Sequence, residues 1–426
     1  MVHHKLVMWL KISYFHLAMF ALLPTTLKLR SPLSRRFWRR VRASRIYVLY
    51  SFFCTCLVFI ELPFLVPHNI FTGYMSRNIV LQSGFFVNLS IRMLGILGCY
   101  GFVWLFRSRL LQLFGELAAH WRFYGPLLQR LVGARALEHL ELSLAALMRR
   151  KLGVIYGLLA ASAYVQYILI PAATGANFVA MCMTLSHMVL LNVASIGFYT
   201  ILLLLYHQFE SVNLALLRLY ETLCCYERSG KLYYSMEEQR RCLNHLRRTA
   251  DLHSDCYCLA RRFFCMYDVP NATLFLNMFS TTIYILYHAV QFSNSTINPS
   301  IWGMLAGQTL VTLNFWNSCL LMNMVDGVLC ACNDTGQRLR QFTDLQLFSN
   351  EFEKELQRFA SNVRDHRLVY KICRCVELNK PACLSFLCTA LLQVIVLMQF
   401  DMGQKRFAPP SPSSIPMLPV PKQIGS

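Results

Sequence analysis

Seven stretches of this sequence are apolar over the length that a helix needs to cross a lipid bilayer, about 20 residues. Only 15% of the residues are charged, whereas soluble domains carry about 25%, so a soluble fold would leave much apolar surface in water. We therefore expect an all-α integral membrane protein with seven transmembrane helices. The predicted spans are residues 46–67, 79–106, 152–172, 178–206, 266–292, 301–329 and 382–400.

The basic residues predict the orientation of these spans. Of the 41 Lys and Arg residues, 36 fall in four segments that alternate along the chain with four others holding only four basic residues. The basic segments are 1–45, 107–151, 207–265 and 330–381. The segments that are poor in basic residues are 68–78, 173–177, 293–300 and 401–426. Because cytoplasmic loops hold the Lys and Arg, we expect a cytosolic N-terminus and an extracellular C-terminus.

The same distribution excludes other classes of function. The net charge of +20 does not indicate nucleic-acid binding, because the basic residues lie between membrane-length runs rather than on one folded face. The sequence holds no metalloprotease, nucleophile-elbow or phosphate-loop motif. We therefore expect no enzyme, no cofactor and no metal site.

The segments outside the spans complete the expected organisation. Residues 6–24 are apolar but contain Lys11, which favours a helix at the cytosolic interface within segment 1–45. The sequon at Asn294 falls in a predicted outer loop and is the expected glycosylation site. Residues 401–426 are rich in Pro and predict an extracellular tail. Large apolar residues at helical spacing predict amphipathic helices in segment 330–381. They are Phe342, Leu345, Phe348, Phe352, Leu356 and Phe359.

The last span carries a polar stripe. Ser385, Thr389 and Gln393 recur every four residues, and Leu397 and Phe400 continue the same helix face. A polar stripe that ends in a bulky aromatic residue suits a water-facing wall with a gate. The alternative is a contact between helices that Ser, Thr and Gln side chains hold together. The spacing fits both.

Arg92 lies in the middle of the second predicted span. A lone cation at that depth is costly and faces a partner or a cavity. We expect a structural ion pair, with Glu61 or Asp326 as the partner, and contact with a polar ligand is the alternative.

Aromatic walls with a few polar groups suit small organic ligands, although Tyr and Trp also concentrate at membrane interfaces. The candidate ligand-pocket residues in the spans are Arg92, Tyr164, Tyr167, His187, Tyr284, His288, Gln308 and Trp316.

The end of the last span resembles a known signature. Residues 394–398 are five hydrophobic residues followed by Gln399 and Phe400, similar to the closing signature of insect gustatory receptors, Thr-Tyr, five hydrophobic residues and Gln-Phe. Leu392 and Gln393 stand at the Thr-Tyr positions. Residues 376–381 also resemble the segment that precedes this span in the family. The inverted seven-span plan matches the family over nearly the whole chain.

The resemblance implies a function. These receptors are ligand-gated cation channels of the plasma membrane of gustatory receptor neurons, built as homo- or heterotetramers around a pore that the seventh span, 382–400, lines. It implies a ligand pocket for a small tastant within residues 46–329 and anchor helices within 330–381. A bitter-type tastant is the default class, and cations and membrane lipid are the other partners. The pore and gate residues that it implies are Gln393, Val396, Leu397, Gln399 and Phe400.

Two other classes remain as alternatives. A metabotropic seven-span receptor needs an extracellular N-terminus, which the distribution of basic residues contradicts. A secondary transporter often has repeated halves with Gly- or Pro-broken helices, which this sequence lacks, although seven spans do not exclude it.

Overall fold

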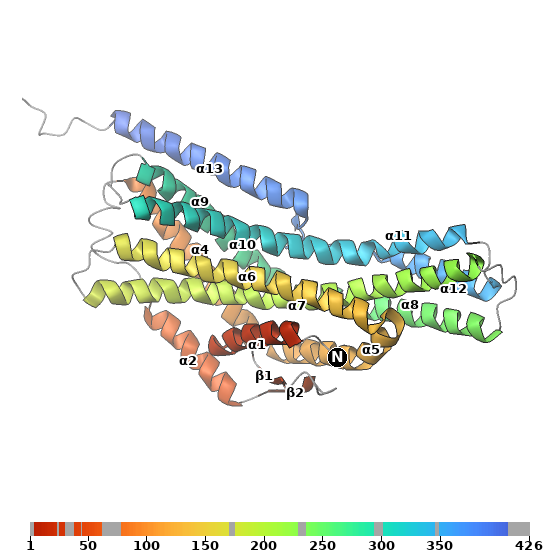
Figure 1. Ribbon diagram of the computed structural model, residues 1–426. Coiled ribbons are helices and arrows are strands. Elements are labelled where there is room, and N and C mark those ends of the chain that lie inside the picture. Colours follow the sequence, from red (N-terminus) through yellow and green to blue (C-terminus); the bar gives the residue numbers. More distant parts are fainter. Residues whose placement is uncertain are drawn as a thin grey trace, which may run out of the picture.

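The protein is a bundle of long helices that lie side by side (Figure 1). The computed structural model describes residues 4–23, 25–29, 38–43, 45–61, 78–169, 175–228, 236–293, 301–345 and 349–407. Every long element is a helix, so the expected all-α class is correct in outline. Two short antiparallel hairpins add strands that the sequence did not indicate. They are β1 (Thr25–Leu29) with β2 (Trp38–Ala43), and β3 (Lys371–Ile372) with β4 (Val376–Glu377).

A helix forms at each of the seven predicted spans. These helices are α2 (Arg45–Glu61), α4 (Ile79–Leu105), α6 (Ala134–Leu169), α7 (Gly175–Arg228), α9 (Asp268–Ser293), α10 (Ile301–Asn333) and α13 (Lys380–Phe407). Within the described residues, five of them are long and apolar enough to cross a membrane: α4, α7, α9, α10 and α13. The apolar part of α2, Val48–Val58, is shorter, and α6 does not meet the same criterion.

The helix α7 runs well beyond its predicted span, 178–206. It holds 54 residues without an internal break, and Leu216, Leu219 and Leu223 remain buried past the end of the span. No Pro interrupts this stretch, so the helix continues as long as one face finds apolar partners. Together with α6 and α10 it forms the centre of the bundle, because these three helices pack against one another.

A layer of helices covers one end of the bundle, where α8 (Met236–Met266), α11 (Thr335–Arg340) and α12 (Asn350–Asp365) gather (Figure 1). Ser349 caps α12 by accepting a hydrogen bond from the Phe352 backbone N–H at 3.3 Å. Phe352, Leu356 and Phe359 are buried on one face of α12. Phe342 is buried on the separate short helix Gln341–Asp344, so the apolar residues of the expected pattern fall on more than one helix. Phe348 lies outside the described residues, as does Asn294.

Helix α1 (His4–Met19) packs against α6 and α7 and buries Leu6, Val7 and Leu10. The helix α5 (Arg107–Val132) occupies part of a segment that was expected only as a loop between spans. At the opposite edge, α13 packs along one side, against α9, α10 and α4, and its other sides face away from the bundle (Figure 1).

Candidate ligand cavity and pore helix

Five helices converge on a small polar cavity. It has a volume of about 40 Å³ and lies between α4, α6, α7, α9 and α10. That volume holds only a few water molecules. Its polar lining residues are Arg92, Asn192, Ser195, Asn277, Thr281, Asn314 and Asn317. No carboxylate lines it.

Hydrogen bonds between different helices hold the wall of this cavity. The Asn317 side-chain oxygen accepts a bond of 2.6 Å from the Lys151 ammonium, and the Asn317 amide donates to the Asn192 side-chain oxygen at 3.3 Å. Asn314 donates to the Thr282 hydroxyl at 2.9 Å. Lys151 is fully buried, and its ammonium lies 5.4 Å from the centre of the Tyr199 ring. Asn192, Asn314 and Asn317 are therefore held in place, whereas the Ser195 hydroxyl and the Asn277 side-chain oxygen are buried without a hydrogen-bond partner among the described residues.

Arg92 does not form the ion pair that we expected. Among the described residues, Glu61 lies 3.4 Å from His187 Nε2 and accepts a hydrogen bond from Ser186 at 3.0 Å. The other candidate partner, Asp326, forms an ion pair with Lys380 at 3.4 Å. Each carboxylate has a nearer partner than Arg92, so the expectation of an ion pair with either is wrong. Arg92 instead lines the cavity, with the Tyr284 phenol nearby.

The other candidate pocket residues divide into two groups. His187 is fully buried near Arg92, and Tyr284 packs edge-to-face on His288 with ring centres 4.3 Å apart. These three therefore gather around the region of Arg92. The second group is exposed on the outside of the bundle and does not line the cavity. It consists of Tyr164, Tyr167, Gln308 and Trp316.

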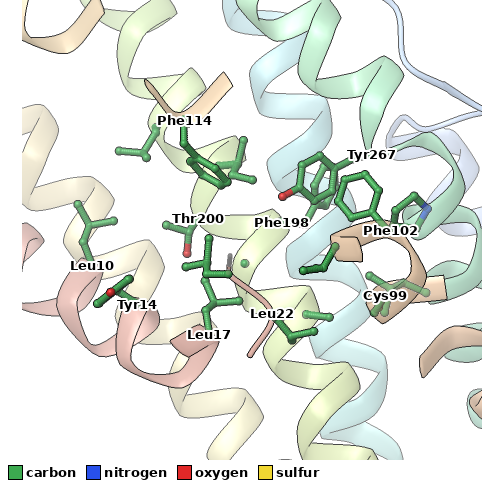
Figure 2. A pocket seen from close by; sticks show the side chains of 18 residues that line it. Leu10, Tyr14, Leu17, Leu22, Cys99, Phe102, Phe114, Phe198, Thr200 and Tyr267 are labelled. Carbon is green, nitrogen blue, oxygen red and sulfur yellow. The ribbon is translucent and has the colours of Figure 1, made fainter. Parts of the chain in front are cut away.

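A second cavity is apolar and was not predicted from the sequence. It measures about 90 Å³ and lies where α1 covers α4, α7 and α9 (Figure 2). Phe102, Phe198 and Tyr267 form its aromatic side, and Leu10, Tyr14 and Leu17 of α1 close it. A Cβ on Gly197 would lie 2.8 Å from Leu17, so glycine at that position allows α1 to pack closely. The sequence does not indicate how α1 packs on the other helices, so it does not predict this cavity.

The exposed surface of α13 has two different faces. Leu384, Leu391 and Ile395 recur at helical spacing and form a wholly apolar face. Ser385, Thr389 and Gln393, which are also exposed, lie on a separate polar face. The implied pore residues continue this surface toward the end of the helix, with Val396 42% exposed, Leu397 half-buried, and Gln399 and Phe400 exposed.

A buried carboxylate that the sequence reasoning missed holds the far end of α13. Asp401 accepts hydrogen bonds of 2.9 Å from Asn78, at the start of α4, and of 2.9 Å from Gln291 on α9. Tyr287 joins the group by accepting a bond from Gln291 at 3.0 Å. We call Asn78, Tyr287, Gln291 and Asp401 the α13 latch. The sequence feature that could have identified it is the Asp directly after the Gln-Phe pair. A carboxylate at the end of a span needs a partner, so its position indicates a contact with another helix.

None of the described residues forms a group of three or more His, Cys, Asp or Glu that could hold a metal ion. The polar groups of the cavity and the latch can therefore act through hydrogen bonds and charge.

The comparisons with known proteins agree with this architecture. The family model described as 7tm Chemosensory receptor matches residues 10–404. A Drosophila melanogaster protein named "Putative gustatory receptor 58b" is 41% identical over 95% of each chain. Its relative 58a from the same organism is 30% identical over 85% of this chain and 91% of that protein.

Two solved structures share the fold. The insect olfactory receptor OR5 from Machilis hrabei aligns with a TM-score of 0.60 over 92% of this chain and 98% of that chain, at 16% identity. The same receptor in complex with eugenol aligns with a TM-score of 0.57 over 93% and 100% of the two chains, at 15% identity. At these identities the likeness establishes the fold. By its sequence, this chain belongs to the insect gustatory receptors of the 7tm chemosensory receptor family.

Proposed function

We propose that this protein is a taste receptor of the plasma membrane that works as a ligand-gated, non-selective cation channel. Its seven helices cross the membrane with the N-terminus in the cytosol, as the distribution of basic residues predicts. Four copies, identical or mixed with related receptors, surround a pore that α13 lines. A small tastant, by default of the bitter class, opens the pore.

The surface of α13 carries this proposal. Only 11% of its apolar stretch is buried, against 72% for α7. A helix that faced only lipid would not expose Gln393 in the middle of its length, because a side-chain amide in hydrocarbon lacks hydrogen-bond partners. A water-filled pore satisfies Gln393 and Ser385, and the separate apolar face with Leu391 can meet lipid or a neighbouring subunit.

The gate lies at the outer end of the polar face. Phe400 is 65% exposed there, and Val396 lies on the same side of the helix. Rings of such side chains from several copies would exclude water when they are close together. A movement that separates them would let the polar groups of the helix hydrate the path.

The polar cavity is the ligand site in this proposal, and α9 connects it to α13. Asn277 and Thr281 of α9 line the cavity, whereas Tyr287 and Gln291 of the same helix belong to the α13 latch. A cavity of about 40 Å³ is smaller than a tastant, so binding has to separate the surrounding helices. A shift of α9 is then transmitted through the latch to α13.

Current recording across a panel of tastants tests the proposal. Cells that express the protein, alone or with related receptors, should give a cation current that persists when G-protein signalling is blocked. Arg92→Gln should reduce the response at least about ten-fold if the ligand contacts the guanidinium, because charged hydrogen bonds contribute about 1.5–3 kcal/mol. Arg241→Gln, a change of an exposed arginine on α8, is the matched control. A current that disappears when G proteins are blocked would favour the metabotropic alternative.

A further inference from the structure

A wide cleft lies between α4 and α5 on one side and α8 and α9 on the other. It shares Phe102 and Pro270 with the apolar cavity and no lining residue with the polar cavity. Its volume is about 630 Å³. It spans the level at which α4 ends at Leu105, α5 begins at Arg107 and α9 begins at Asp268. In the predicted orientation this level is the cytosolic surface of the membrane, because segments 107–151 and 207–265 carry basic residues.

The cleft is apolar on the membrane side of that level. Leu97, Leu105 and Val269 line it and are exposed, with Leu105 80% exposed. Gly98 and Gly101 form part of the wall on α4, and a Cβ on Gly101 would meet no atom within 4 Å. Gly101 therefore leaves an open apolar channel, which suits hydrocarbon chains.

The other end of the cleft is polar and carries excess positive charge. Arg262 forms an ion pair of 2.6 Å with Glu116, and Gln112 donates to the second oxygen of the same carboxylate at 3.0 Å. Arg109 also lines this end, and its guanidinium lies 5.7 Å from the centre of the Phe106 ring. Among the described residues Arg109 has no carboxylate partner, so the lining groups carry one positive charge that Glu116 does not compensate.

An open apolar channel that leads to two exposed arginines suits an amphipathic molecule with hydrocarbon chains and an anionic headgroup. We propose that this cleft binds an anionic phospholipid of the cytosolic leaflet, with its acyl chains along Leu97, Gly101 and Leu105 and its phosphate between Arg109 and Arg262. The cytosolic leaflet is the one that holds anionic lipids, and basic pockets between helices on that side suit their headgroups. This assignment is independent of the proposed ligand site, since the two share no lining residue.

Native mass spectrometry of the purified full-length protein tests the proposal with two lipids that have the same chains, dioleoyl phosphatidylserine and dioleoyl phosphatidylcholine. The wild-type protein should retain phosphatidylserine in preference to phosphatidylcholine. The double variant Arg109→Gln, Arg262→Gln should lose this preference. Each substitution should lower the ratio of retained phosphatidylserine to retained phosphatidylcholine about five-fold. The double variant Arg240→Gln, Arg241→Gln removes the same charge from α8 outside the cleft and should keep the preference.

A second variant tests the apolar half of the cleft without changing charge. Gly101→Leu fills open space, so it should fold and lower the retention of both lipids. Gly153→Leu, at another open position on α6, should retain lipid as the wild type does. Equal retention of the two lipids by the wild type would overturn the proposal. So would an unchanged preference in Arg109→Gln, Arg262→Gln, or wild-type retention by Gly101→Leu.

Discussion

At the scale of single residues, Asp401 links the candidate pore helix to the helices of the candidate ligand cavity. Its two oxygens accept hydrogen bonds from Asn78 and Gln291, which lie on α4 and α9. Bonds to an ionised carboxylate are stronger than neutral ones and each contributes about 1.5–3 kcal/mol. The latch therefore contributes enough free energy to bias the position of α13.

The substitution Asp401→Asn tests this role. An asparagine presents one amide nitrogen where the carboxylate presents a second oxygen, so one of the two bonds becomes a contact between two donors. We expect a higher basal current and a shift of at least about five-fold in the half-maximal tastant concentration, which corresponds to about 1 kcal/mol. Met402→Leu, an exposed neighbour outside the latch, is the control. Wild-type currents from Asp401→Asn at equal surface expression would contradict the role of the latch.

His253 makes the helical layer around α8 sensitive to acid. It is 4% exposed and lies between the rings of Phe209 and Phe359, and burial lowers its pKa to about 4. The unfolded chain has the higher pKa, about 6.5, so it binds a proton first as the pH falls. The stability contributed by neutral His253 is therefore complete above about pH 6.5 and is lost as the pH falls toward about 4.

Thermal unfolding of the purified protein measures this effect. His253→Phe keeps an aromatic ring in the site but cannot take up a proton, so the loss of stability between about pH 6.5 and about pH 4 should be smaller by at most about 3 kcal/mol. The exposed His139→Gln should follow the wild type. Parallel pH profiles for wild type and His253→Phe would show that the buried ring is not the cause.

The residues of the site show how far sequence reasoning reaches. It identified Arg92, because a cation within a span has to be accommodated. It assigned the wrong partners, because pairing depends on the depth and rotation of each helix, which hydropathy does not report. Tyr164 and Trp316 were chosen by residue type, yet both are exposed. Asp401 was missed because its partners lie 323 and 110 residues away in the sequence.

At the scale of elements, α13 and α10 approach closely near the start of α13. The sulfur atoms of Cys319 on α10 and Cys383 on α13 are 3.7 Å apart. If α13 moves when the pore opens, a covalent link at this point should hinder opening. An added oxidant such as copper phenanthroline can form that link by taking two electrons as the two thiols lose their protons.

We therefore expect the oxidant to reduce the tastant-evoked current and dithiothreitol to restore it. Cys319→Ser should abolish the effect, and Cys388→Ser, a change of an exposed cysteine on the same helix, should leave it intact. Mass spectrometry would verify the linked peptide. An undiminished current through a fully linked protein would show that α13 does not move relative to α10.

The positions of the elements were easier to predict than their lengths and partners. Long apolar runs must be helical in a bilayer, so helices occur at all seven predicted spans. The 54 residues of α7 exceed its predicted span because the C-terminal part of the helix is stabilised by packing against α8, which lies in a different part of the sequence. The helix α5 and the β1–β2 hairpin depend in the same way on their neighbours, and local patterns did not indicate them.

At the scale of the whole molecule, one helix with a polar face lies at the edge of a packed bundle. An exposed α13 fits a fold that is completed by other copies, since oligomers most often close around a symmetry axis. In this account the single chain is incomplete as a channel. In the proposed mechanism, the cavity, the α13 latch and the polar face of α13 form one route from ligand to pore.

Single-channel recording of the purified protein in a planar lipid bilayer tests the central claim, that the polar face of α13 lines the conducting path. Gln393→Trp and Leu391→Trp add the same bulky side chain to the same helix, the first on the polar face and the second on the apolar face. The account predicts that Gln393→Trp reduces or abolishes the unitary cation current and that Leu391→Trp leaves it unchanged. Equal unitary currents in the two variants, or a block caused only by Leu391→Trp, would contradict it.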